Sequence, residues 1–360
     1  MKILIFNWRD IKKPGAGGAE VYTHEVAKRL VHRGHSVTLF TSMFKNGLKM
    51  EYIDGVKIIR AGSKFSVYWK GKEYYKKFLA KQRFDVVIDE INTRPFFAVD
   101  FVNKGEKTVA LIHQLAREFW FYETPSPINL IGYHFLEKIW LKKYKNVPTI
   151  TVSNSTKEDL KKWGFENIFV VHNGLNVQPL DKIPKKSDKP VVIFVGRMKK
   201  AKKPQDVIEA FKIVRKKIKE AELWMVGDGY MRAKLEDKNV QGVKFWGYVD
   251  KNTKDELVKK AWVIAVPGVR EGWGQVVTDA NALGTPAVGY DIPGLRDSIK
   301  NGYNGILVKP HLQFFADALI NVLENVSFRK QLSQNAIKWA KQFSWDRSAD
   351  EFERLIKITI

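Results

Sequence analysis

Two carboxylates lie eight residues apart in the segment REGWGQVVTDANALGTP (270–286). Glu271 precedes a Gly-Trp-Gly turn, and Asp279 falls about two turns into the helix predicted after that turn. If the helix begins near Gly274, the carboxylates are roughly 12 Å apart along its axis. The acid and nucleophile of a glycoside hydrolase need only roughly 5 to 10 Å. We therefore expect the two carboxylates to reach different parts of one elongated ligand.

The start of this helix predicts an anion site between the two carboxylates. Helix N-termini offer backbone N–H groups and a partial positive charge, and the amides concerned belong to Gly274, Gln275, Val276 and Val277. A nucleotide sugar fits this arrangement: one carboxylate accepts from sugar hydroxyls, the helix end holds the diphosphate, and the other carboxylate accepts from ribose hydroxyls. The alternative is a capping glutamate and a solvated helix aspartate, because acidic residues are common near helix starts.

A second candidate anion site is the cationic segment GRMKKAKKPQD (196–206), between a predicted strand and a predicted helix. Five cations crowd its turn: Arg197, Lys199, Lys200, Lys202 and Lys203. Such charges repel one another unless an anion lies among them, and arginine presents a planar fork to phosphate. The alternative is a set of solvated surface lysines.

The glycine-rich segment PGAGGAE (14–20) lies between the first predicted strand and the first predicted helix. Glycines let the backbone approach an oxyanion at the carboxyl edge of a sheet. Gly15, Gly17 and Gly18 do not follow the dinucleotide fingerprint, and a turn without a ligand is the alternative.

The elements that must position these loops alternate along the chain. Apolar runs predict strands at 2–7, 36–40, 85–89, 108–112, 149–153, 168–171, 191–196, 222–227, 243–247, 261–268, 285–290 and 306–309. Amphipathic stretches predict helices between most of them, including 19–34 and 205–218. Uniformly apolar strands indicate parallel sheets covered on both faces. The pattern predicts an α/β protein with two doubly wound, Rossmann-like domains.

The domain boundary falls in a segment rich in turn signals and prolines, NGLNVQPLDKIPKKSDKP. We expect an N-terminal acceptor-binding domain at 1–173, a linker at 174–189 and a C-terminal donor-binding domain at 190–344. The last helix, 345–360, is long enough to pack back on the first domain.

Composition limits the classes of binding partner and of chemistry open to this protein. The net charge is +23 over 360 residues, which predicts attraction to nucleic acid, anionic lipid or a phosphorylated small molecule. There is no cysteine, which excludes disulfides, thiolate metal sites and a cysteine nucleophile. No apolar stretch reaches the roughly 18 residues of a spanning helix, and the start MKILIFNW is not that of a signal peptide. We expect a soluble, cytoplasmic protein.

Four segments, taken in order, resemble the retaining family 4 glycosyltransferases (glycosyl transferases group 1) with the GT-B fold. EGWGQVVTDANALGTPAVGYDIPGLRDSI resembles their carboxylate–seven–carboxylate motif, and GRMKKAK resembles their donor loop. GGAEVYTHEVAKRLVHRGHSVTLF resembles their N-terminal motif, and VVHNGLN the Asn-Gly segment before the linker. The resemblance implies two domains facing a central cleft and a nucleotide-sugar co-substrate.

The resemblance also implies roles for individual residues. Arg197 and Lys202 would neutralise the donor diphosphate, with Glu271 beside the transferred sugar and Asp279 at the ribose. Gly272 would be a further donor contact. Gly17 and Gly18 would close over donor phosphate and acceptor. His113 would contact the sugar, and the backbone near Tyr248 would clamp the nucleobase. Two departures are Asp279, where the family usually has glutamate, and Gln114 after His113, where it often has aspartate.

The predicted reaction is transfer of a hexose from a UDP- or GDP-sugar to a hydroxyl, with retention at the anomeric carbon. Arg197, Lys202 and the helix start would stabilise the leaving diphosphate in place of a metal, because no Asp-x-Asp triplet occurs. The alternatives are a nucleotide-sugar epimerase, a glycogen-type phosphorylase and a basic nucleic-acid-binding protein. The last lacks a recognisable module.

The acceptor is expected on the first domain. The segments 64–78, 117–123 and 138–145 interleave cations with aromatic residues, as membrane-interface segments do. They predict a lipid-linked or membrane-proximal glycan acceptor and peripheral attachment to an anionic membrane. The alternative is ordinary core aromatics on basic helices.

Overall fold

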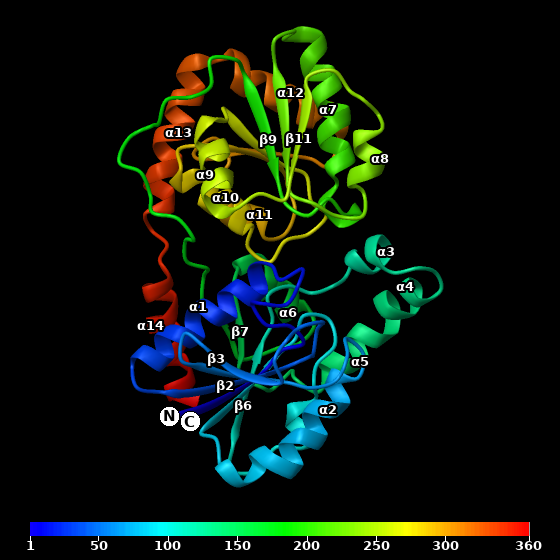
Figure 1. The fold of residues 1–360 in the computed structure, drawn as a ribbon, viewed down its shortest axis with the longest axis vertical. Helices are drawn as coiled ribbons and strands as arrows, with labels where there is room; N and C mark the ends of the chain where they lie inside the picture. The colour runs from blue at the N-terminus through cyan, green and yellow to red at the C-terminus, as the bar shows by residue number, and fades with distance from the viewer. Residues whose placement is uncertain (360) are drawn as a thin grey trace. The chain divides into compact units, whose positions relative to one another are not determined.

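The computed structural model describes residues 1–359, which form two compact units, drawn in Figure 1. Unit 1 contains Met1–Arg117, Ser126–Gly174 and the residues from Ser344 onward. Unit 2 contains Glu118–Pro125 and Leu175–Phe343.

Unit 1 is built on an eight-stranded sheet with the order β3-β4-β2-β1-β5-β6-β7-β8. Its strands are β1 (Lys2–Phe6), β2 (Ser36–Thr41), β3 (Met50–Ile53), β4 (Val56–Arg60), β5 (Val86–Glu90), β6 (Lys107–Leu111), β7 (Thr149–Thr151) and β8 (Ile168–Val170). Neighbouring strands are parallel except β3 and β4, which form an antiparallel hairpin. Without β3, the first six strands have the 3-2-1-4-5-6 order of a doubly wound fold.

The sequence did not predict β3 and β4. Their turn is Asp54–Gly55, and both residues have positive φ, 49° and 78°. This is the geometry that two-residue hairpin loops require, and Asp-Gly is one of the pairs that favour it. Charged residues interrupt the apolar pattern of both strands, so the turn pair was the better signal.

The helices of unit 1 cover both faces of its sheet (Figure 1). They are α1 (Gly18–His32), α2 (Val67–Tyr74), α4 (Ile128–Ile131), α5 (Glu137–Lys142), α6 (Asn154–Lys162) and α14 (Trp345–Thr359), with short η1 (Tyr75–Leu79), η2 (Ala80–Gln82), η3 (Ala98–Asp100) and η4 (Gly132–Leu136). The C-terminal α14 packs against α1. Trp345 meets Tyr22 edge to face at 5.9 Å, and Arg29 pairs with Asp346 at 2.6 Å.

Unit 2 has a six-stranded, fully parallel sheet with the order β11-β10-β9-β12-β13-β14. The strands are β9 (Val191–Val195), β10 (Glu222–Val226), β11 (Val243–Gly247), β12 (Val263–Val266), β13 (Ala287–Tyr290) and β14 (Gly305–Val308). The helices are α3 (Phe119–Glu123), η5 (Lys200–Lys202), α7 (Pro204–Lys217), α8 (Arg232–Glu236), α9 (Lys251–Lys260), α10 (Gln275–Ala282), α11 (Leu295–Ser298), α12 (Leu312–Glu324) and α13 (Val326–Ala340). This strand order is again 3-2-1-4-5-6.

Two segments lie elsewhere than the predicted domain limits imply. Residues 118–125, expected in the N-terminal domain, group with unit 2. Residues 175–189, expected to be a linker, also belong to unit 2, because their backbone bonds to its helices and loops. Leu180 N–H donates to Ala282 O, and Ser187 N–H to Lys260 O, both at 2.9 Å.

The strand order fixes where ligands are expected. It reverses between β1 and β5 in unit 1, and between β9 and β12 in unit 2. In doubly wound sheets, ligands bind beyond the carboxyl ends of the strands at this switch point. The glycine-rich loop follows β1, the cationic loop follows β9, and the Glu271 loop follows β12.

Candidate functional site

The cationic loop and the Glu271 loop meet at the switch point of unit 2. The Lys202 ammonium donates to Glu271 Oε1. The two residues come from the ends of β9 and β12, which are adjacent strands in the sheet. The structure therefore brings together the cation predicted to bind the diphosphate and the carboxylate predicted to bind the sugar.

Backbone geometry holds Glu271 in place. Its N–H donates to Pro293 O at 3.1 Å. Gly294 lies so close that a Cβ there would come within 2.1 Å of Glu271 O, so a side chain cannot be accommodated without movement. Trp273, 3% exposed, anchors the same loop by packing edge to face on Phe343.

Three of the five loop cations form one group. The pKa of Lys199 is lowered to about 8, chiefly by burial; the negative charge of Glu123 opposes this shift, and the positive charges of Arg197 and Lys202 add to it. Lys203 turns away, pairing with Asp206 at 3.3 Å and lying over the ring of Tyr290. Lys200 is exposed. Arg197, Lys199 and Lys202 are therefore the cations that an anion would meet together.

A carboxylate of the protein itself lies against this cation group. Glu123, at the end of α3, accepts from the Ala201 N–H at 3.0 Å and lies 3.9 Å from the Lys199 ammonium. Tyr230 also donates to it, at 3.4 Å. The same segment is held at its other end by Arg270, which donates to Glu118 at 2.9 Å. Sequence analysis missed Glu123 because it assigned residues 117–123 to a membrane-interface stretch.

Asp279 lies in α10 and is almost completely buried. Its Oδ1 accepts from the Asn176 N–H and the Gln275 side chain, and its Oδ2 accepts from the Asn176 side chain, at 2.9 to 3.0 Å. Burial raises the pKa of this carboxyl group. A carboxylate has about four acceptor positions, so about one remains, on Oδ2. Asn176 is a residue that sequence reasoning missed.

The predicted amides at the start of α10 are not equivalent. Gly274 caps the helix with φ of 87°, a left-handed conformation that favours glycine. The Val277 N–H closes the first turn on Gly274 O at 2.8 Å. This N–H is therefore used inside the turn, and a contact between Val277 and the donor stays a prediction. Gln275 donates its side chain to Asp279, while Val276 and Gly272 belong to the same loop-to-helix junction.

Tyr248 lies apart from the other predicted residues of unit 2. It follows β11, the edge strand, two strands away from β9. Its side chain is 86% exposed. Because neighbouring strands are about 4.8 Å apart, this backbone is about 10 Å from the end of β9.

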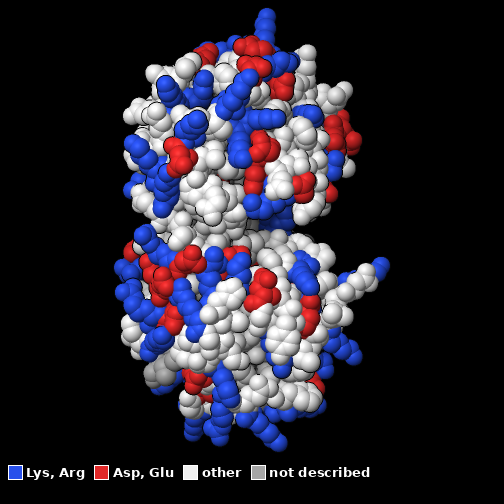
Figure 2. All heavy atoms as spheres, turned by 60° about the vertical axis from the view of Figure 1, so that its left-hand side comes forward, with Lys and Arg blue, Asp and Glu red and all other residues white. Residues whose placement is uncertain are grey.

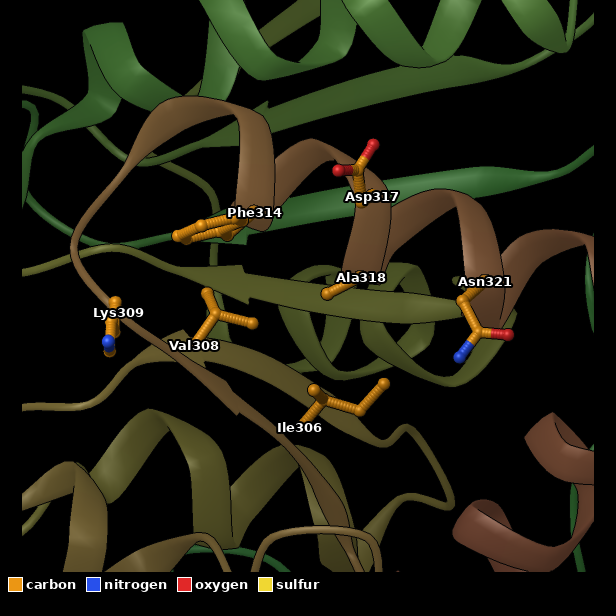
Figure 3. A pocket seen from close by; sticks show the side chains of 7 residues that line it. All are labelled: Ile306, Val308, Lys309, Phe314, Asp317, Ala318 and Asn321. Carbon is orange, nitrogen blue, oxygen red and sulfur yellow. The ribbon is translucent and has the colours of Figure 1, made fainter.

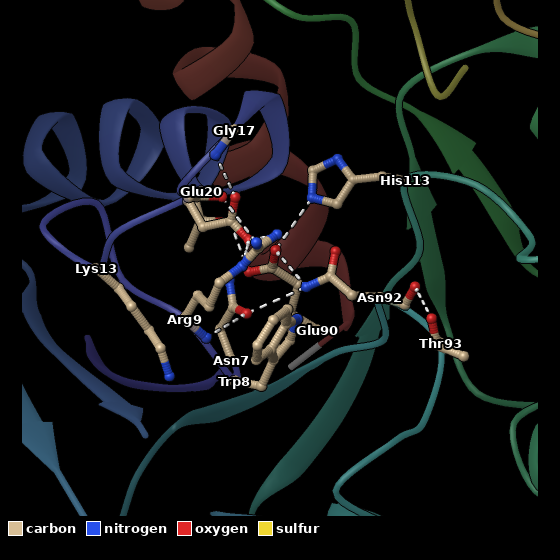
Figure 4. A network of polar contacts seen from close by, with 12 residues as sticks. Asn7, Trp8, Arg9, Lys13, Gly17, Glu20, Glu90, Asn92, Thr93 and His113 are labelled. Carbon is tan, nitrogen blue, oxygen red and sulfur yellow. Dashed lines mark hydrogen bonds and ion pairs between the residues drawn. The ribbon is translucent and has the colours of Figure 1, made fainter. Parts of the chain in front are cut away.

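In unit 1, the predicted Gly17 and His113 belong to one polar network, shown in Figure 4. Gly18 is the first residue of α1. Gly17 precedes α1, and its N–H donates to Glu20 at 2.6 Å. Arg9 donates to Glu20 at 2.8 Å and to Gly15 O at 2.7 Å. The Gly17 N–H is therefore satisfied by a carboxylate of its own helix, although glycine at the N-cap has no side chain to complete a capping box.

His113 follows β6 and belongs to the other half of this network. Its Nε2 donates to Glu90 Oε1 at 3.2 Å, and Thr23 donates to Glu90 Oε2 at 2.6 Å. The imidazole meets Tyr22 edge to face at 5.1 Å. Glu90, at the end of β5, thus orients His113. Sequence reasoning missed Arg9, Glu20 and Glu90.

Two structural features are absent from residues 1–359. None of their helices combines the length and apolar character that crossing a membrane requires. No three acidic, histidine or cysteine side chains in this range gather closely enough to hold a metal ion.

Comparisons with known proteins match the whole architecture. The family model described as Glycosyltransferase Family 4 matches residues 16–179, and the one described as Glycosyl transferases group 1 matches residues 179–339. An uncharacterized glycosyltransferase of Methanocaldococcus jannaschii is 28% identical over 100% of this chain and 99% of its own length.

Solved structures share the fold. Sucrose-phosphate synthase from Thermosynechococcus elongatus superposes with a TM-score of 0.81 at 20% identity, covering 99% of this chain and 98% of that one. Anabaena HepE, solved with UDP and glucose, superposes with a TM-score of 0.69 at 18% identity, covering 98% of each chain. The chain belongs to the family 4 (group 1) glycosyltransferases of the GT-B fold and is a retaining, nucleotide-sugar-dependent enzyme.

Proposed function

We propose that this enzyme transfers a hexose from a UDP- or GDP-hexose to a hydroxyl of a lipid-linked or membrane-proximal glycan, without a protein-bound metal ion. Unit 2 binds the donor and unit 1 binds the acceptor. The observation that carries the proposal is the group formed by Arg197, Lys199, Lys202 and Glu271 at the switch point of unit 2.

The donor diphosphate replaces internal carboxylates as the partner of the cation group. Its oxygens take the positions near Lys199 and the Ala201 N–H that Glu123 occupies. They also take Lys202, which releases Glu271 to accept from hydroxyls of the transferred sugar. Donor binding thereby replaces two internal pairs, Lys199–Glu123 and Lys202–Glu271, with contacts to the diphosphate and the sugar.

Bond cleavage places negative charge on the departing phosphate. Arg197 and Lys202 stabilise this charge from fixed positions, and the start of α10 adds its partial positive charge. The acceptor hydroxyl attacks from the leaving-group side, and the departing phosphate takes its proton. This course retains the anomeric configuration and needs no protein nucleophile.

The remaining donor contacts involve the ribose, the nucleobase and the sugar. Asp279 offers ribose about one acceptor position, because Asn176 and Gln275 use the others. The backbone near Tyr248 contacts the nucleobase. In unit 1, His113, held by Glu90, contacts the sugar, and Gly17 and Gly18 line the phosphate and acceptor side.

The surface of unit 1 supports an acceptor at a membrane. The helical run from Ile128 to Lys142 exposes Ile128, Ile131, Phe135 and Ile139, which recur every three or four residues. Phe135 and Ile139 are each 62% exposed, an outward-facing apolar stripe. Lys138, Lys142 and Lys143 lie exposed at its end. Aliphatic and aromatic residues beside lysines fit an anionic lipid surface.

A second exposed helix lies beside the first. α2 and its approach expose Phe65 at 80% and Trp69 at 78%. The Arg94 guanidinium lies 4.9 Å from the ring of Tyr68 in α2 and 5.9 Å from that of Trp140 in α5, so it joins the two helices. Basic side chains gather at the lower end of unit 1 in Figure 2, where α2 lies in Figure 1.

The experiment is transfer of hexose from UDP- and GDP-hexoses to octyl glycosides, run with EDTA and with magnesium, with the product anomer read by NMR. We expect transfer in EDTA and a retained anomer. Transfer that requires magnesium would contradict the proposal that the cation group stabilises the leaving diphosphate in place of a metal ion. An epimerised donor without glycoside product would favour the epimerase.

A further inference from the structure

A pocket of unit 1 has no part in the function described so far. Its volume is about 880 Å³, within the range of pockets that bind small molecules. Its apolar lining comes from Met43, Phe44, Met50, Ile59 and Tyr74. Two lysines, Lys45 and Lys49, complete its exposed rim.

The hairpin missed by sequence analysis creates this pocket. β2 and β4 are parallel and end at the same edge of the sheet. β3 returns antiparallel to β4, which sets Met50 opposite Ile59. The residues that follow β2 then face the start of β3, and Tyr74 of α2 closes the side.

The charge inside the pocket is already neutralised. Arg60 is buried and donates to both Asp10 oxygens at 2.7 and 2.9 Å, and it also pairs with Glu51. Its guanidinium lies 4.9 Å from the ring centre of Phe44. The interior therefore offers apolar surface rather than a free cation. At the rim, neither Lys45 nor Lys49 forms an ion pair within the part of the chain that the structure describes.

The pocket adjoins the network of Figure 4. Lys13, drawn there, donates to Ser42 and to Met43 O, and its ammonium lies 5.4 Å from the ring centre of Trp8. Trp8 in turn packs under Arg9, whose guanidinium also holds the glycine loop. A ligand in the pocket is thus a few contacts from Gly17.

We infer that this pocket holds the hydrocarbon chain of an amphiphilic acceptor whose anionic head meets Lys45 and Lys49. The inference rests on the proposed function, since it names the class of acceptor that unit 1 takes. Apolar lining selects the chain, and the two unpaired lysines select a phosphate-like head rather than a cationic one. Tyr74 joins the pocket to α2, one of the two exposed helices.

A pocket of unit 2 is the matched comparison (Figure 3). It has a volume of about 390 Å³ and lies between the edge strand β14 and α12, away from the switch point. Phe314 supplies apolar surface there, but Asp317 and Asn321 line the same pocket. Phe314→Glu therefore controls for adding a charge at a half-exposed apolar side chain outside the proposed site.

The test uses the full-length chain and calorimetric titration with octyl phosphate, decyl phosphate and inorganic phosphate, below micelle formation. We expect decyl phosphate to bind about tenfold or more tightly than octyl phosphate, because each methylene buried contributes about a threefold to fourfold gain. Inorganic phosphate should bind far more weakly. Met50→Glu, at an exposed position, should weaken decyl phosphate at least about tenfold, and Phe314→Glu should not.

Equal binding of octyl and decyl phosphate would overturn the inference, as would binding that Met50→Glu leaves unchanged. Lys45→Gln with Lys49→Gln should weaken decyl phosphate and leave decanol binding unaltered. The UDP-induced rise in melting temperature, measured on the same Met50→Glu protein, keeps the two proposals apart. If Met50→Glu keeps the UDP-induced rise but loses decyl phosphate binding, the pocket proposal is supported. If UDP raises the melting temperature of neither wild type nor any variant, only the proposed donor site is contradicted.

Discussion

The two units share a strand order but treat charge in opposite ways at their switch points. In unit 1, the charged groups beyond β1 and β5 satisfy one another: Arg9 binds Glu20, and Glu90 binds His113 and Thr23. In unit 2, Arg197, Lys199 and Lys202 outnumber the carboxylates beside them. A self-paired site suits a ligand of hydroxyls, and a cation-rich site suits a diphosphate.

The comparison also explains Glu123 and Glu271. Cations held close together raise the free energy of the folded chain unless anions lie among them. Unit 2 supplies those anions from its own loops, and both carboxylates keep partial contact with solvent. The donor can displace them, whereas the carboxylates of unit 1 are fixed by helix caps and strand ends.

The largest effect should come from removing the cations of unit 2. Arg197→Ala and Lys202→Ala should each lower kcat by about 10²- to 10³-fold, as loss of a preorganised charge contact does. Steady-state transfer from UDP-hexose measures this. Lys200→Ala, in the same loop but outside the charge group around Lys199, should change kcat little. An equal loss in that variant would contradict the assignment.

A second change acts on unit 1 alone. Phe135→Glu with Ile139→Glu should reduce binding to anionic vesicles by at least about tenfold, because it places charge on the apolar stripe. Vesicle flotation with phosphatidylglycerol, compared with phosphatidylcholine, measures it. Val326→Glu, an exposed apolar position of unit 2, is the control. Vesicle binding that depends on neither lipid charge nor these two residues would contradict the proposal that unit 1 attaches to the membrane through this stripe.

Alkaline pH should weaken the donor site and leave the site of unit 1 unaffected. Burial lowers the pKa of Lys199 to about 8, so free protein loses this charge above that pH, while a bound diphosphate favours the charged form. Affinity for UDP-hexose should be flat below pH 8 and fall by up to about tenfold per pH unit above it. Calorimetry across this range measures the slope, and Lys199→Gln should flatten it.

The smallest effect should follow from Glu123→Gln. This change keeps the shape and removes the negative charge that competes with the donor, so UDP-hexose should bind about three- to fivefold more tightly, since such exposed pairs contribute up to about 1 kcal/mol. Glu118→Gln, on the same segment but paired with Arg270, is the control. Weaker binding in Glu123→Gln would mean that Glu123 assists the donor.

Most strands and several site residues could be predicted from short segments of the sequence. Uniformly apolar runs predicted twelve strands, and the βα loops named Arg197, Lys202 and Glu271 because ligands lie at the carboxyl edge. The adjacency of β9 and β12, which brings Lys202 to Glu271, depends on strand order. Periodicity does not encode that order.

Residues that act from another segment escaped prediction. Asn176 reaches Asp279 across 103 positions, and Glu123 reaches Ala201 across 78. No spacing rule covers such distances. The Asp54–Gly55 turn was different, because its hairpin-turn pair was present locally.

The central claim is that the cation group of unit 2 grips the donor diphosphate without a metal ion. The most direct measurement is the melting temperature of the full chain with UDP or GDP in EDTA, for wild type and for Arg197→Ala with Lys202→Ala. The account predicts a rise in wild type that the double variant loses and Lys200→Ala keeps. A rise that requires magnesium, or one that the double variant retains, would contradict it.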